Sequence, residues 1–85
     1  MEPVGAVALA PALAELVSNR STVLNSLNRH AEALGGYDRA LALKPQFTDA
    51  INNRGITLNA LNRFDEALAC FERAIALHPD YVNAH

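Results

Sequence analysis

The chain has 85 residues, enough for one small domain, and 51% of them are hydrophobic. Its net charge of −2, without any basic cluster, excludes a strong binder of the nucleic-acid phosphate backbone. A single cysteine excludes an internal disulfide and a thiolate-rich zinc site. No apolar run approaches the roughly 18 residues that a membrane-spanning helix needs. We therefore expect no nucleic-acid partner and no membrane partner.

The apolar stretch 4–16 does not resemble a secretion signal. No Lys or Arg precedes it, Glu2 does, and Pro11 interrupts it. We expect a cytoplasmic protein, unless the sequence is a fragment that has lost its export signal.

The sequence repeats with a period of 34 residues. Aligning 14–47 with 48–81 gives 15 identities in 34 pairs, among them Asn19/Asn53, Arg20/Arg54 and Pro45/Pro79. We therefore divide the chain into four segments. These are a preceding repeat's tail or an N-terminal extension (1–13), two full repeats (14–47 and 48–81), and the start of a further, truncated repeat (82–85).

Each repeat contains two predicted helices, which gives the spans 12–27, 31–43, 48–61 and 65–77. In the first span, Leu13, Leu16, Val17, Leu24 and Leu27 recur at helical spacing and predict a buried face. Turns follow at Asn62, because Asn tolerates left-handed backbone, and at Pro79, because the residue before proline leaves helical geometry.

The residue pattern of both units resembles the tetratricopeptide repeat. Eight signature positions are occupied in register in the two copies, although Arg20 and Arg54 stand where the family usually has a large aliphatic residue. The predicted core positions that belong to this signature are Val17, Ser21, Leu24, Ala33, Tyr37, Ala40 and Pro45 in the first unit, and Ile51, Gly55, Leu58, Ala67, Phe71, Ala74 and Pro79 in the second. The resemblance implies an all-α fold, a right-handed α-solenoid of antiparallel helix pairs.

Small residues at fixed positions predict close helix contacts. Gly55 and Ser21 would leave room for Phe71 and Tyr37, while Ala40 and Ala74 would receive the next unit's first helix. Gly35 and Gly36 lie inside a predicted helix, where each Gly costs about 1 kcal/mol relative to Ala. We expect their joint replacement by Ala to stabilise the chain by up to ~2 kcal/mol, unless one of them permits a close contact.

The resemblance places the first helix of each unit along a concave groove that binds a protein or an extended peptide. The groove residues are predicted to be Glu15, Asn19, Thr22, Asp49, Asn52, Asn53 and Ile56. On the same helices, Ser18, Asn25 and Asn59 are also expected to lie away from the core. Asn19 and Asn53 occupy the place of an asparagine ladder found in some related arrays, and an Asn side chain offers the donor and the acceptor that a peptide backbone needs. The alternative is that these are ordinary polar surface positions.

The other reactive side chains favour structural roles. The Arg20 and Arg54 stems are expected to pack between helices, with the head groups on a carboxylate or a helix end. Cys70 has no basic neighbour in sequence, and the three histidines share no metal spacing. We predict no enzyme, no cofactor and no metal site.

Two further interpretations remain open. The Asn-rich first helices and the A-L-A-L-x-P endings resemble arrays that precede domains related to O-linked N-acetylglucosamine transferase, which implies a substrate-recognition arm. Alternatively, the segment self-associates through open solenoid ends, because the last full repeat should expose Leu68, Phe71 and Ile75.

Overall fold

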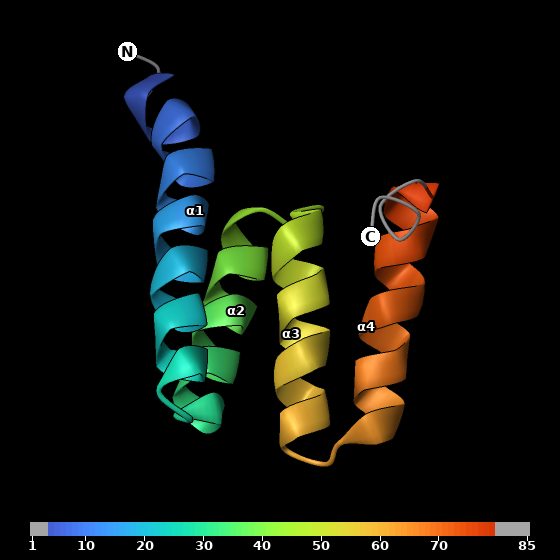
Figure 1. Ribbon diagram of the computed structural model, residues 1–85. Helices are drawn as coiled ribbons and strands as arrows, with labels where there is room; N and C mark the ends of the chain where they lie inside the picture. Colours follow the sequence, from blue (N-terminus) through green and yellow to red (C-terminus); the bar gives the residue numbers. More distant parts are fainter. Residues whose placement is uncertain (1–3, 80–85) are drawn as a thin grey trace.

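The computed structural model describes the backbone of residues 4–79 and the side chains of residues 11–79. This part of the chain holds four helices and no strand: α1 (Val4–Ser26), α2 (His30–Leu43), α3 (Thr48–Ala60) and α4 (Phe64–Leu77). Each helix runs antiparallel to the one before it, and the four stand side by side in chain order (Figure 1). The fold is therefore the expected all-α array of helix pairs, α1 with α2 and α3 with α4. None of the described helices combines the length and the apolar character needed to cross a membrane.

The predicted helix spans are confirmed within a few residues for α2, α3 and α4, but the span of α1 is wrong. This helix begins at Val4 instead of residue 12 and continues through Pro11. Proline inside a helix removes one backbone hydrogen bond, and the surrounding alanines are the strongest helix formers. The predicted start of a further repeat, 82–85, lies outside the described residues.

Both units use the same turn between their two helices. Asn28 and Asn62 have a φ of 63°, the left-handed conformation expected for Asn after a helix. The following amides, of Arg29 and Arg63, donate to the carbonyls of Leu24 and Leu58. The second helices end at Leu43 and Leu77, two residues before a proline, as predicted.

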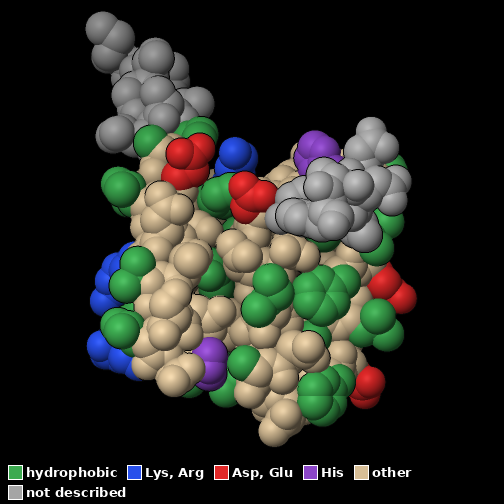
Figure 2. Space-filling view, in the orientation of Figure 1, with side chains coloured by type: hydrophobic (Ala, Val, Ile, Leu, Met, Phe, Trp, Pro, Cys, Tyr) green, Lys and Arg blue, Asp and Glu red, His purple; other side chains and the backbone are tan. Residues whose placement is uncertain are grey.

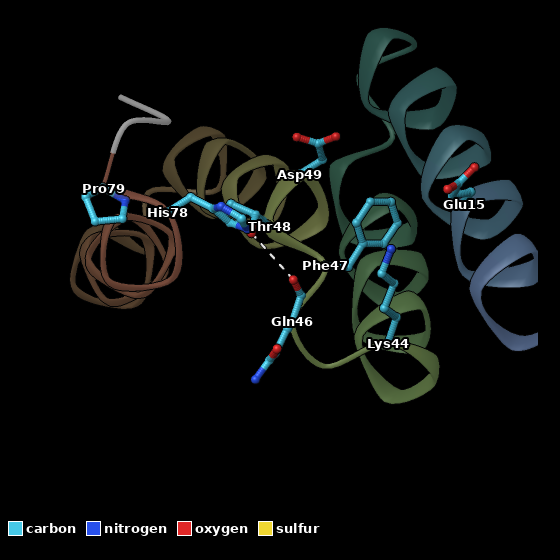
Figure 3. Close-up of a pocket in the computed structure, with 8 residues that line it drawn as sticks. All are labelled: Glu15, Lys44, Gln46, Phe47, Thr48, Asp49, His78 and Pro79. Carbon is cyan, nitrogen blue, oxygen red and sulfur yellow. Dashed lines mark hydrogen bonds between the residues drawn. The ribbon is translucent and has the colours of Figure 1, made fainter. Parts of the chain in front are cut away.

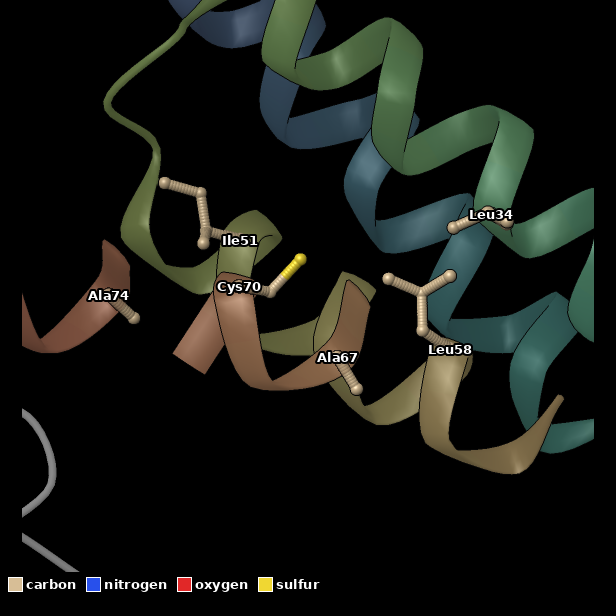
Figure 4. Close-up of a cluster of buried hydrophobic side chains, with 6 residues drawn as sticks. All are labelled: Leu34, Ile51, Leu58, Ala67, Cys70 and Ala74. Carbon is tan, nitrogen blue, oxygen red and sulfur yellow. The ribbon is translucent and has the colours of Figure 1, made fainter. Parts of the chain in front are cut away.

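The core consists of two clusters that meet between α2 and α3. The first cluster contains Leu24, Ala33, Tyr37, Ala40 and Ala50, with Val17 packed against it. The second contains Leu34, Ile51, Leu58, Ala67, Cys70 and Ala74, with Phe71 packed against it (Figure 4). The signature residues within the helices therefore lie in the core as predicted, whereas Pro45 and Pro79 are exposed at the helix ends.

Several expectations for α1 are wrong. Leu13, Leu16 and Leu27 are exposed, because α2 covers only one side of α1. Ser18, expected away from the core, is buried. The stripe of apolar side chains on α1 is wider than the surface that one neighbouring helix can cover.

The predicted close contacts are confirmed in the second unit and differ in the first. A Cβ on Gly55 would lie 2.7 Å from the Phe71 ring, so Gly55 does make room for Phe71. In the first unit Ser21 lies against Gly36, where an added Cβ would be 1.8 Å from the Ser21 Oγ. The expected gain from replacing Gly36 by Ala is therefore wrong. Around Gly35 there is no atom within 4 Å of such a Cβ.

Candidate functional site

The candidate groove is formed by the first helices of the two units, α1 and α3, which contact each other directly. Positions 34 residues apart occupy equivalent places on these two helices. The predicted groove residues Glu15, Asn19 and Thr22 are exposed on α1. On α3, Asp49 and Ile56 are exposed, while Asn52 and Asn53 are half-buried. All seven therefore have side chains that solvent reaches.

The asparagine side chains differ in whether they already form hydrogen bonds within the chain. Among the described side chains, Asn19, Asn52 and Asn53 make no hydrogen bond to another side chain or to the backbone. Asn25, by contrast, is bonded through its Oδ1 to the Nδ1 of His30 and ties the end of α1 to the start of α2. The amides of Asn19 and Asn53 are therefore available to a ligand, whereas the Oδ1 of Asn25 is already bonded.

Thr22 has a structural contact that its sequence position did not indicate. Its hydroxyl donates to the Ser18 carbonyl, at 3.1 Å, and lies 2.9 Å from the Tyr37 hydroxyl. Burial raises the pKa of Tyr37, and the bond with Thr22 opposes this effect. Thr22 thus positions the buried ring of Tyr37 between α1 and α2.

A hollow of about 570 Å³ lies at one end of the groove, between α1, the loop before α3 and the end of α4 (Figure 3). Two predicted groove residues line it, Glu15 from α1 and Asp49 from α3. The loop adds Lys44 and Phe47, with the Lys44 ammonium 4.8 Å from the centre of the Phe47 ring. No sequence pattern indicated these two loop residues, because their approach to α1 depends on how the units stack.

Arg54 lines a second hollow, of about 390 Å³, which lies between α2, α3 and α4. Its Nε donates to the Asp38 carboxylate at 2.6 Å, and its Nη1 lies 3.1 Å from the Cys70 Sγ. Burial lowers the pKa of Arg54, and the bonds to Asp38 and Cys70 outweigh that effect, so the pKa is raised. The predicted structural role is confirmed for Arg54, whose head group joins three helices. Cys70 is buried in the core beside it. The predicted role is wrong for Arg20, which is exposed on α1 and makes no hydrogen bond within the described residues, because no described helix packs on that side of α1.

No group of three potential metal ligands occurs within the described part of the chain. The chemistry that the groove can perform is hydrogen bonding through asparagine amides, with a charged and aromatic end at Glu15, Asp49 and Phe47. These features define a class of protein, a stacked helix-pair array with a polar groove.

The comparison with known families agrees with this class. Residues 48–81, the second unit, match the family model of the tetratricopeptide repeat. This match supports the tetratricopeptide-repeat family, whose repeats are in general non-catalytic scaffolds for protein interaction. No curated protein matches the chain, so no relative supports the resemblance to arrays that precede glycosyltransferase domains.

Proposed function

We propose that this protein is a non-catalytic module that binds an extended peptide or a segment of a protein along the groove of α1 and α3. The observation that carries the proposal is the equivalent placement of Asn19 and Asn53 on two first helices that touch, with both amides free of intramolecular hydrogen bonds among the described side chains. Asn is a weak helix former, costing roughly 0.5 kcal/mol relative to Ala. A ligand that accepts hydrogen bonds from both amides and donates hydrogen bonds to them compensates for that cost.

The spacing of the two helices suits a peptide backbone. Packed helices lie about 8–10 Å apart, and three residues of extended chain span roughly 10 Å. The Asn19 and Asn53 side chains would therefore hold main-chain groups about three residues apart. Because these bonds address the main chain, binding depends little on the peptide's side chains. Each asparagine contributes on the order of 1 kcal/mol net.

The test is a fluorescence-anisotropy titration with a labelled pool of random-sequence peptides, at micromolar chain. We expect Asn19→Ala combined with Asn53→Ala to weaken binding on the order of tenfold or more, since two such contributions are lost. Arg39→Ala, an exposed position on α2, is the control and should bind like the wild type. Equal binding by the double variant and the wild type, or a loss in the control, would place the ligand elsewhere. Circular dichroism checks that all variants keep their helices.

A further inference from the structure

Two faces of the molecule carry apolar side chains that no described helix covers. The α1 end face consists of Leu16, Val23 and Leu27 around Arg20, and the α4 end face consists of Phe64, Leu68 and Ile75 around Glu72. They lie on opposite sides of the array, at the outer edges of α1 and α4 (Figure 2). Exposed apolar stripes of this kind indicate an interaction surface.

The joint between α2 and α3 shows what such faces contact inside this chain. At the 34-residue offset, the two end faces match eight residues of the joint. Leu34, Ala50 and Thr57 are buried there, whereas the others are half-buried (His30, Leu41, Arg54, Leu61) or exposed (Asp38). Leu34 is 9% exposed at the joint, whereas its equivalent Leu68 is 56% exposed. Ala50 and Thr57 are fully buried, whereas their equivalents Leu16 and Val23 are 66% and 59% exposed. The α4 end face thus corresponds to the α2 side of the joint, and the α1 end face to its α3 side.

The charges of the two faces are complementary in the same register. At the α2–α3 joint, Arg54 bonds to Asp38. The equivalent residues are Arg20 on the α1 end face and Glu72 on the α4 end face. In Figure 2, basic and apolar side chains share the outer edge of α1, and acidic and apolar side chains share the outer edge of α4. Pairing two α1 faces or two α4 faces would bring like charges together, which opposes association.

We propose that the α4 end face of one molecule binds the α1 end face of a second copy, head to tail, and so repeats the α2–α3 joint between chains. Arg20 then pairs with Glu72 of the neighbouring copy. The larger Leu16 and Val23 replace Ala50 and Thr57, which makes this joint more apolar than the internal one. Because the contact joins two different faces, it leaves one of each kind free and assembly continues beyond a dimer.

The test is sedimentation equilibrium of the 85-residue chain from micromolar to millimolar concentration. We expect the average mass of the wild type to rise with concentration past that of a dimer. Leu16→Glu disrupts the α1 end face and Leu68→Glu disrupts the α4 end face. Each variant by itself should therefore remain monomeric. Mixed in equal amounts, the two variants retain one intact pair of faces and should form a 1:1 complex and nothing larger. Ile56→Glu, which changes an exposed apolar residue in the groove, is the matched control and should assemble like the wild type.

The charge register has its own test. Arg20→Glu should weaken assembly, and adding Glu72→Arg to the same chain should restore it, since the pair is then reversed. A wild type that stays monomeric to millimolar concentration would overturn the proposal. So would self-association of Leu16→Glu alone or Leu68→Glu alone, which would indicate pairing of like faces. Helical circular dichroism at each concentration confirms that the variants are folded; they replace exposed side chains.

Discussion

At the scale of single residues, the two units solve the same packing problem differently. In the second unit, Gly55 on α3 leaves space that the Phe71 ring of α4 fills. In the first unit, the equivalent position of α1 carries Ser21, and the missing side chain is on α2 at Gly36. Ser21 is fully buried and donates to the Val17 carbonyl at 3.0 Å. One small residue on either helix is enough for the two to approach.

This arrangement predicts opposite effects for two adjacent glycines. Gly35→Ala should raise the free energy of unfolding by up to ~1 kcal/mol, because Ala is the better helix former and nothing lies near the new methyl group. Gly36→Ala should lower it by about 1–3 kcal/mol, because the methyl group meets Ser21. Urea unfolding followed by circular dichroism measures both changes.

A compensating substitution checks the cause. Adding Ser21→Gly to Gly36→Ala recreates the arrangement at Gly55 and should recover most of the loss. If Gly36→Ala alone is as stable as the wild type, the contact with Ser21 does not restrict this position.

At the scale of helices, α2 and α4 begin with the same ion pair. Arg29 bonds to Glu32, and Arg63 bonds to Glu66 at 2.8 Å, in each case three residues apart across the first turn. Neither helix start has a side-chain cap hydrogen bond. The glutamates also place negative charge near the positive end of the helix dipole. Hydrogen bonds from Arg29 and Arg63 lower the pKa of Glu32 and of Glu66.

The lowered pKa values predict a loss of stability in acid. A carboxylate with a lower pKa in the folded state contributes stability above its ordinary pKa near 4.5, and this contribution disappears as the pH falls through the folded value. Glu32→Gln with Glu66→Gln should therefore lower Tm slightly at neutral pH and make Tm less dependent on pH below about 4.5. Because both pairs are exposed and salt screens them, the effect should shrink at high ionic strength.

The comparison is made by thermal unfolding from pH 3 to pH 7, with Glu15→Gln as the control that leaves both pairs intact. Superimposed Tm curves for the wild type and the double variant would show that the pairs contribute nothing to folding.

At the scale of the whole molecule, stacking of the units joins parts of the chain that lie far apart in sequence. Glu15 and Asp49 stand at one end of the groove, on either side of Phe47, in the hollow that Figure 3 shows. Two carboxylates and one ammonium, that of Lys44, line this hollow. Within the proposed function, this end favours a basic side chain on the bound peptide.

We therefore expect a peptide with one lysine to bind a few-fold more tightly than the same peptide with glutamate at that position, as is typical of exposed charge pairs. The preference should fall as salt rises. Replacing Glu15 by Gln and Asp49 by Asn should abolish the preference while leaving the binding of a neutral peptide unchanged. Competition titrations of the three peptides at two salt concentrations measure this; a preference that survives the double replacement would assign it to other residues.

Much of the fold follows from the sequence because it depends on local properties. The period of 34 residues, the helix ends before Pro45 and Pro79, and the left-handed turns at Asn28 and Asn62 each depend on a short stretch of chain. Gly55 belongs with them, since its place in the repeat signature indicated a close approach. The predicted span of α1 is wrong, because the alanines on both sides of Pro11 favour the helix more than one proline opposes it.

In contrast, only the tertiary structure decided which side chains are exposed and which residues they contact, because both depend on which helix lies beside each helix. Leu16 and Ala50 occupy equivalent positions, yet one is exposed and the other buried, since α2 packs on α3 and no described helix packs on the outer side of α1. The bonds of Arg54 to Asp38 and Cys70 and of Thr22 to Tyr37 cross between helices, as does the hollow around Phe47. A repeating sequence therefore determines the unit, and the neighbours that a unit receives determine which of its side chains form the core and which remain free to bind.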